Sequence, residues 1–141
     1  MRRVAVAVIA FAMTSGGYAQ LAAGTWVMRE TPQISMVVEP VGSGYSITYH
    51  MVGADGKPIR MTLQTPLDGS ETPFLVNGKP TGQTYAGKRV DSRHSIGVVK
   101  MNGKAVATSK AELSTDGKTI TVENDNTDGS AGKRIEHWDK R

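Results

Sequence analysis

The chain has 141 residues, and its 17 lysines and arginines exceed its 13 aspartates and glutamates, which gives a formal charge of +4. The basic residues are scattered singly or in pairs, without the cluster interleaved with aromatic side chains that a nucleic-acid groove requires, so nucleic acid is excluded as the main partner. The chain contains no cysteine, which excludes disulfides, thiol nucleophiles and thiolate metal sites.

The first residues have the pattern of a secretory signal. Arg2 and Arg3 precede the apolar run 4–13, and small and polar residues follow that run up to Ala19. The run is ten residues long, whereas a membrane-spanning helix needs about twenty. We therefore expect residues 1–19 to be a removable signal peptide and the protein to be exported, periplasmic or secreted, with no integral membrane segment after cleavage.

Residues 20–141 are expected to form one domain. Cleavage leaves 122 residues, with 15 basic side chains against 13 acidic ones. A chain of this length can bury a core without disulfides or a structural metal. Its stability is therefore expected to come from packing.

This expected domain is a series of short β-type runs separated by Gly, Asp and Asn, and no segment has the period of a helix. Ten strands are predicted, at residues 25–29, 34–39, 45–52, 58–65, 73–76, 84–90, 94–101, 105–113, 118–123 and 133–138.

The breaks between these runs carry residues that accept positive φ. Asp-Gly and Asn-Gly pairs are the preferred residues of two-residue hairpin turns. They occur here as Asp55-Gly56, Asp68-Gly69, Asn77-Gly78, Asn102-Gly103 and Asp116-Gly117. Consecutive strands are therefore predicted to be neighbours in an antiparallel meander.

Alternation of apolar and polar residues predicts a sheet with one buried face. Tyr45, Ile47, Tyr49 and Met51 share one face of their strand, while the residues between them are mostly polar. A meander of many such strands must close or fold over, because open edges invite aggregation. The predicted fold class is all-β, an antiparallel up-and-down β-barrel of about 8 to 10 strands, with a β-sandwich as the alternative.

Two stretches resemble the lipocalins and their calycin relatives. Gly24-Thr25-Trp26, at the start of the first predicted strand, resembles the Gly-x-Trp signature of that family, and the run 114–122 leading into 126–129 is similar to the C-terminal part of small exported bacterial lipocalin-like proteins. The resemblance implies a lipocalin-like barrel in which Gly24 and Trp26 are structural and a late cation stacks on Trp26, for which Arg134 is the candidate. The disulfide of many members is absent.

A set of methionines and tyrosines on the predicted inward faces forms the candidate ligand site. Thioethers adapt to irregular ligands, and tyrosines add a polar group to an apolar wall. The candidates are Met28, Met36, Tyr45, Tyr49, Met51 and Met61. Ala105, Ala107, Ser109 and Ala111 alternate along one strand, which leaves space if their face points inward. The alternative is that the methionines fill gaps in a core without a ligand.

No catalytic, metal or cofactor site is predicted. His50, His94 and His137 lack metal-ligand spacing, and His137 as a haem ligand is the less favoured interpretation. Ser92 and His94 are tied to no acid by a hydrolase motif. Asp125 and Asp128 are expected to be solvated loop residues rather than calcium ligands.

The sequence therefore predicts an exported, non-catalytic, lipocalin-like protein that binds a small apolar or amphipathic ligand in the barrel lumen. One alternative is a ligandless barrel that acts through its outer surface as an interaction or inhibitor module, which a filled lumen would favour. A second is an enzyme that uses the lumen as a chamber. An inward cluster such as Arg89, His94 and Glu112 would favour the enzyme.

Overall fold

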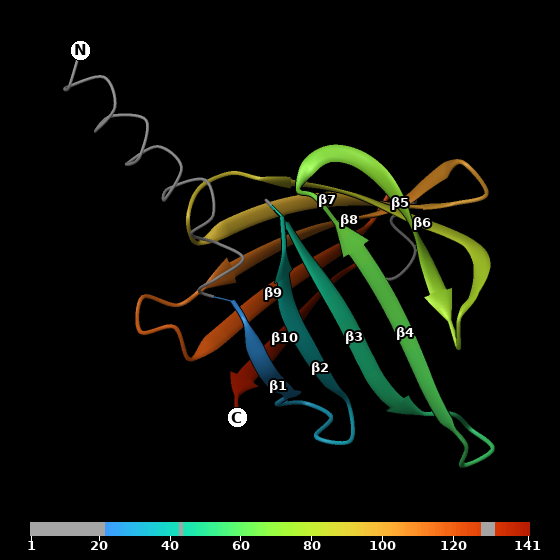
Figure 1. Ribbon diagram of the computed structural model, residues 1–141, viewed down its shortest axis with the longest axis horizontal. Coiled ribbons are helices and arrows are strands. Elements are labelled where there is room, and N and C mark those ends of the chain that lie inside the picture. The colour runs from blue at the N-terminus through green and yellow to red at the C-terminus, as the bar shows by residue number, and fades with distance from the viewer. Residues whose placement is uncertain (1–21, 43, 128–131) are drawn as a thin grey trace.

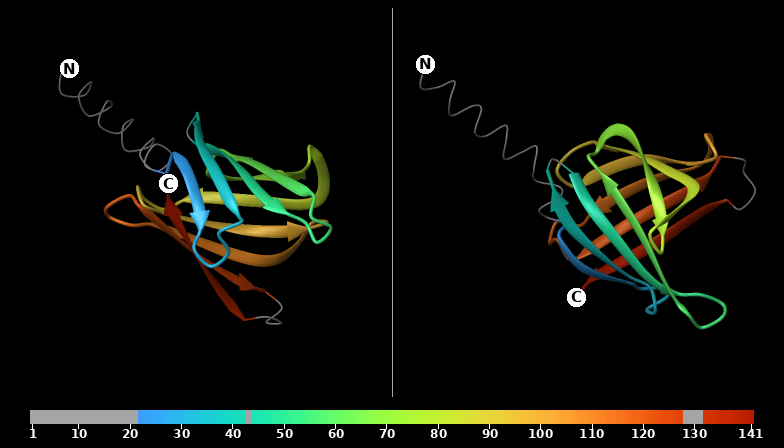
Figure 2. Two further views of the ribbon diagram at one scale, coloured as in Figure 1. Left: turned by 90° about the horizontal axis from the view of Figure 1, so that it is seen from below. Right: turned by 45° about the vertical axis from the view of Figure 1, so that its right-hand side comes forward.

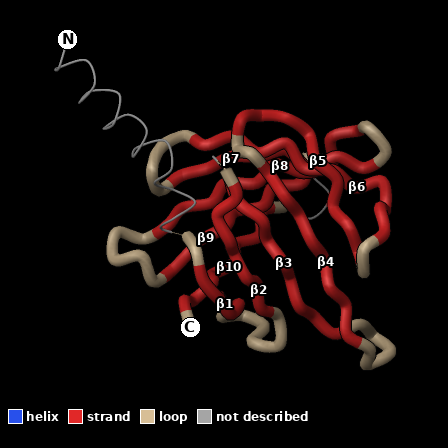
Figure 3. Tube along the Cα trace, viewed as in Figure 1, coloured by secondary structure: helices blue, strands red, loops and turns tan. Residues whose placement is uncertain are grey.

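A computed structural model describes residues 22–42, 44–127 and 132–141, and within them every regular element is a β-strand (Figures 1 and 3). In chain order the strands are β1 (Gly24–Met28), β2 (Ser35–Val41), β3 (Gly44–Val52), β4 (Pro58–Thr65), β5 (Asp68–Val76), β6 (Lys79–Arg89), β7 (His94–Met101), β8 (Lys104–Leu113), β9 (Thr119–Asn126) and β10 (Lys133–Lys140). All ten predicted strands are present.

The ten strands form a closed barrel in which each strand pairs antiparallel with its neighbours in the chain. The barrel closes where β1 pairs with β10, with Trp26 opposite Lys140 and Met28 opposite Trp138. Figure 2 shows the sheet curving round until β1 lies beside β10. The predicted up-and-down barrel is therefore confirmed, and the sandwich alternative is wrong.

Both of the predicted Asn-Gly pairs form tight hairpins. Asn77 and Asn102 have φ of 50° and 52°, and the glycines after them, Gly78 and Gly103, also have positive φ. Positive φ at both central residues is the geometry of a type I′ turn, whose twist matches that of the flanking strands. These turns connect β5 to β6 and β7 to β8, and they set the register of the strand pairs next to them.

The inward side chains pack most densely at one end of the barrel, where β1 begins and β10 ends. Trp26, Leu67, Leu113, Ile120 and Trp138 are all buried there in one apolar cluster. Leu67 belongs to the short connection between β4 and β5, which folds across this end. We call it the closed end, and the opposite end, where β10 begins, the open end.

Gly44 allows that connection to pack closely against the start of β3. A Cβ atom at Gly44 would lie 1.9 Å from the carbonyl oxygen of Thr65 and 2.6 Å from the Cα of Pro66. Any side chain at position 44 would therefore push the β4–β5 connection away from the closed end.

β4 and β5 share fewer paired residues than any other two neighbouring strands of the barrel. These strands pair only at Met61–Val76 and Thr62–Leu75, and beyond those pairs the first half of β5 pairs with β6 alone. An outer groove follows the separation, bordered by residues that include Gln64, Pro66, Thr72 and Pro73. The separation is visible in Figure 1, where the first half of β5 bends away from β4 in a wide arc.

Some strand boundaries differ from the prediction. β5 begins at Asp68 and β6 at Lys79, each five residues earlier than predicted. Asp68-Gly69, predicted as a turn, lies inside β5, where Gly69 has φ of 92° and the pairing with β6 shifts register. A glycine with positive φ at a register shift is typical of a β-bulge, which bends a strand without ending it.

The predicted signal peptide, residues 1–19, lies outside the described residues, so its removal stays a prediction. Within the described part of the chain no helix is long and apolar enough to cross a membrane.

Candidate ligand-binding cavity

The barrel encloses a cavity of about 470 Å³. Cavities that hold small molecules are usually about 300–1,000 Å³ and mostly apolar, so this one has a suitable size. All six residues predicted as ligand contacts line its wall: Met28, Met36, Tyr45, Tyr49, Met51 and Met61. Ala107, Ser109 and Ala111 line it as well, and these small side chains leave space beside β8. The structure brings the predicted site together, and ligand binding at it stays a prediction.

Aromatic side chains from several strands shape the cavity beyond the predicted set. Trp138 lies against Tyr49, with ring centroids 5.9 Å apart, and Phe74 meets Tyr85 at 6.1 Å in an edge-to-face arrangement. All four residues line the cavity. Paired rings of this kind hold each other in place, so the wall is pre-shaped rather than loose.

The ring of Tyr85 packs directly against two glycines, which make room for it. A Cβ at Gly97 would come within 2.2 Å of the Tyr85 ring, and a Cβ at Gly87 within 2.5 Å. These glycines lie opposite each other on β7 and β6. A side chain at either position would force the ring of Tyr85 into the cavity.

Trp26 is buried in the apolar cluster at the closed end of the barrel. Its side chain is fully buried, and its indole N–H donates a hydrogen bond of 2.9 Å to the carbonyl of Ala22. The Lys140 ammonium lies 5.5 Å from the centre of the indole ring. At Gly24 a Cβ would lie 3.1 Å from Lys140 Cε, so the glycine gives this lysine room.

Arg134, predicted as the cation stacked on Trp26, is not the residue that fills that role. Lys140 does, because the β1–β10 register places it directly opposite Trp26. Arg134 lies near the beginning of β10, at the open end, where it lines the cavity.

Polar side chains line the cavity near the open end. Gln83, Asn124, Arg134 and Glu136 belong to this group. The Glu136 carboxylate accepts one hydrogen bond from the amide of Asn124, at 3.3 Å, and another from the indole N–H of Trp138, at 3.2 Å. Arg134 is exposed and forms no ion pair within the described residues.

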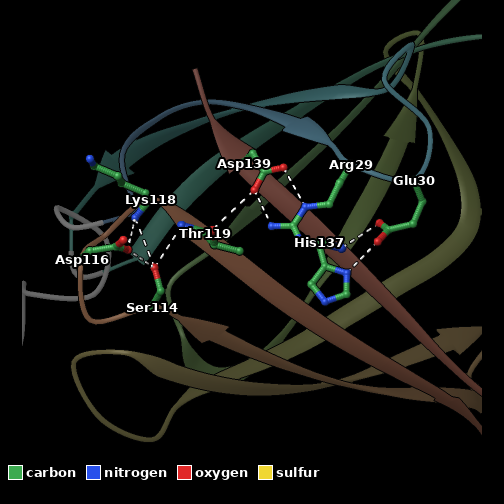
Figure 4. A network of polar contacts seen from close by, with 8 residues as sticks. All are labelled: Arg29, Glu30, Ser114, Asp116, Lys118, Thr119, His137 and Asp139. Atoms are coloured by element: carbon green, nitrogen blue, oxygen red, sulfur yellow. Dashed lines mark hydrogen bonds and ion pairs between the residues drawn. The ribbon is translucent and has the colours of Figure 1, made fainter.

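An ion pair and a histidine–carboxylate contact outside the barrel fasten the β1–β2 loop to β10 (Figure 4). Arg29 donates two hydrogen bonds to the Asp139 carboxylate, at 2.9 and 2.7 Å. Glu30 accepts the His137 backbone N–H at 2.8 Å and lies 2.6 Å from its ring Nδ1. We call these four residues the clasp. The same loop carries Ile34, which lines the cavity, so the clasp holds part of the cavity wall.

The clasp shifts the pKa of both its carboxyl groups downward. Hydrogen bonds from the His137 backbone and ring lower the pKa of Glu30, and hydrogen bonding from the Arg29 guanidinium lowers that of Asp139. His137 therefore faces Glu30 on the outer surface, and it is not among the residues that line the cavity.

The stretch 114–122, part of the predicted family resemblance, forms the β8–β9 turn and the start of β9. The hydroxyl of Ser114 donates to Asp116 at 2.6 Å and accepts the backbone N–H of Thr119 at 3.0 Å (Figure 4). The Asp116 carboxylate also accepts the backbone N–H of Lys118. Local hydrogen bonds of this kind define a turn, and they explain the sequence pattern without any ligand.

The ionisable cluster named for the enzyme alternative does not line the cavity. His94 lies 2.7 Å from Asp91 and 3.5 Å from Glu112, all three on exposed or half-buried parts of the barrel. Arg89 is also absent from the cavity lining. Within the described residues, no three His, Asp or Glu side chains are grouped as metal ligands.

Sequence reasoning missed part of the cavity wall. The unpredicted lining residues include Ile34, Phe74, Tyr85, Val99 and Glu136. A signal was available on the last strand, because Arg134, Glu136 and Trp138 are spaced by two and must share a face. The aromatic pair Phe74 and Tyr85 could be placed only with the register of β5, which its bulge obscures.

The fold and cavity define a ten-stranded antiparallel β-barrel with a hollow, mostly apolar lumen. No protein-family model matches the chain, and no curated protein matches it. Among solved structures, it is similar to a redesigned β-barrel, with a TM-score of 0.46 and 13% identity over 89% of this chain and 95% of the other. It is also similar to a de novo designed fluorescence-activating β-barrel, with a TM-score of 0.42 and 12% identity over 89% and 98%. The barrel assignment rests on the strand pairing itself.

Proposed function

We propose that this protein is an exported, lipocalin-like carrier that holds a small apolar or amphipathic molecule in its barrel lumen. The observation that supports this most is the cavity of about 470 Å³, walled by methionines and aromatic rings. Protein interiors are ordinarily packed with few voids larger than a water molecule. A lumen of this size beside small residues such as Ala107 and Ala111 is therefore suited to an occupant.

The two alternatives have less support. A ligandless interaction module is favoured by a lumen filled with side chains, and here the lumen is hollow. A chamber for catalysis is favoured by ionisable groups that converge inside, and the candidate cluster of His94, Arg89 and Glu112 lies outside the lining.

The proposal is tested by titrating the protein with the neutral apolar dye N-phenyl-1-naphthylamine, whose fluorescence rises in apolar surroundings. Saturable binding is expected for the unmodified protein. Ala107→Trp should abolish it, because position 107 lines the cavity and an indole there would occupy the lumen. Ala105→Trp is the matched control, since Ala105 lies on the same strand but is exposed and outside the lining.

Failure of the unmodified protein to bind the dye would contradict the proposal. So would equal binding by both tryptophan variants, because the dye would then be held on the outer surface. If the two tryptophan variants differ as expected, mass spectrometry of an organic extract of the protein, purified from its own cell envelope, identifies the natural ligand.

A further inference from the structure

The cavity has a polar end and an apolar end. Near the closed end its wall is built of side chains such as Val38, Ile47 and Ile120, together with Trp138. Near the open end the lining includes Arg134 and Asn124, which lie opposite each other on β10 and β9. A molecule held along this axis would place an apolar part deep in the barrel and a polar part near β10 and β9.

The charged side chains at the open end indicate whether the polar part of the ligand is positive or negative. Arg134 is an exposed cation with no ion-pair partner in the part of the chain that the structure describes. The acid two residues along the same strand, Glu136, directs its two oxygens to Asn124 and Trp138 instead. The guanidinium of Arg134 is therefore left available to a ligand.

Arginine is well suited to hold an anion in this position. Its planar fork presents parallel N–H donors that match a carboxylate, and it keeps its charge at any physiological pH. Gln83, another lining residue, carries a side-chain amide that can donate a further hydrogen bond.

We propose that the ligand is an amphipathic anion, with an apolar tail in the lumen and a carboxylate or similar anionic head group bound by Arg134. This inference rests on the proposed function, since it names the chemical class of the molecule that the lumen carries.

The test compares decanoate with 1-decanol, which share one alkyl chain and differ in the head group. Each is used below its aggregation concentration to displace N-phenyl-1-naphthylamine from the protein. The unmodified protein is expected to bind decanoate about tenfold more tightly than 1-decanol, the size of effect of a hydrogen bond to a charged group. Added salt should reduce the preference, because it screens an exposed charge.

Arg134→Gln should remove the preference for decanoate and leave the affinity for 1-decanol unchanged. Arg60→Gln is the matched control, because Arg60 is an exposed cation on β4 that is absent from the cavity lining. It should keep the preference, which separates a local contact from the effect of net charge.

The outcomes separate the two proposals. If 1-decanol binds as tightly as decanoate, the anionic head group is wrong. If Arg134→Gln keeps the preference, Arg134 is not the residue that binds the head group. The carrier function stands in both cases. If neither compound nor the dye binds, the carrier function itself fails.

Discussion

Single glycines determine how closely this barrel packs. Gly44 and Gly97 both lie within strands, and neither has a positive φ, so their role is not to make a turn. Each leaves out a Cβ where another group already lies, the Thr65 carbonyl in the first case and the Tyr85 ring in the second. The two sites differ in whether the neighbouring group can move, and the predicted effects differ accordingly.

At Gly44 the neighbour is backbone, which cannot move without opening the closed end. We expect Gly44→Ala to lower the free energy of unfolding by about 3 kcal/mol, the upper range for overpacking. Gly42→Ala is the comparison, because Gly42 has φ of 60° and open space around it, so only the backbone cost of about 1 kcal/mol applies. Urea unfolding of both variants measures the difference. Equal losses would show that the contact with Thr65 contributes nothing.

At Gly97 the neighbour is a side chain, which can rotate into the cavity. We expect Gly97→Ala to weaken binding of N-phenyl-1-naphthylamine about tenfold, because the displaced Tyr85 ring takes up part of the lumen. The double variant Gly97→Ala with Tyr85→Leu should bind more tightly than Gly97→Ala alone, since leucine is shorter. Additive losses in affinity would contradict this coupling.

At the scale of the strands, much of the fold could be predicted from local chemistry. Alternation along β3 and β4 identified the buried face, and Asn77-Gly78 and Asn102-Gly103 identified two hairpins. The early parts of β5 and β6 could not be found in this way, because they contain Gly69, Pro80 and Gly82, residues that locally disfavour strands. Pairing with neighbouring strands overrides that local preference.

The residues of the candidate site could also be predicted in part from the sequence. The six predicted side chains face inward because alternation fixes faces within a strand. The cation over Trp26 was predicted wrongly because it depends on the register between the two terminal strands. That register joins residues more than a hundred positions apart, and no local pattern encodes it.

The clasp between the β1–β2 loop and β10 predicts a specific sensitivity to acid. The pKa of Glu30 is lowered in the folded state, so the stabilisation by its carboxylate is complete above the unfolded pKa of about 4.3 and is lost as the pH falls through the lower, folded pKa. Glu30→Gln should therefore lose less thermal stability than the unmodified protein between pH 6 and pH 3.

Glu39→Gln is the control for this measurement. Glu39 is an exposed glutamate on β2 outside the clasp, and its variant should follow the unmodified protein in thermal melts at both pH values. Several other acids with lowered pKa, including Asp68 and Asp116, contribute to acid sensitivity in all three proteins. Only the difference between variants reports on the clasp. Identical acid sensitivity in the unmodified protein and both variants would show that the clasp contributes nothing to the pH dependence of stability.

At the scale of the whole molecule, the hollow lumen means that the free energy of unfolding depends on whether a ligand occupies the barrel. A ligand that binds only the folded barrel adds about 2.7 kcal/mol to the free energy of unfolding at a hundred times its dissociation constant. We expect N-phenyl-1-naphthylamine to raise the urea midpoint of the unmodified protein accordingly and to leave that of Ala107→Trp unchanged. An equal rise in both would show that the stabilising site lies outside the cavity.

The pairing of β1 with β10 has a consequence for how the chain acquires its structure. Every other pair joins strands adjacent in sequence, so those hairpins can form as soon as their two strands are available. The edge of β1 that pairs with β10 must wait for the last strand of the barrel to be synthesised. Until then its hydrogen-bonding groups are open to strands of other molecules. The barrel is therefore most exposed to misassembly before β10 has been made, and shortening β10 should turn the closed barrel into an aggregating sheet.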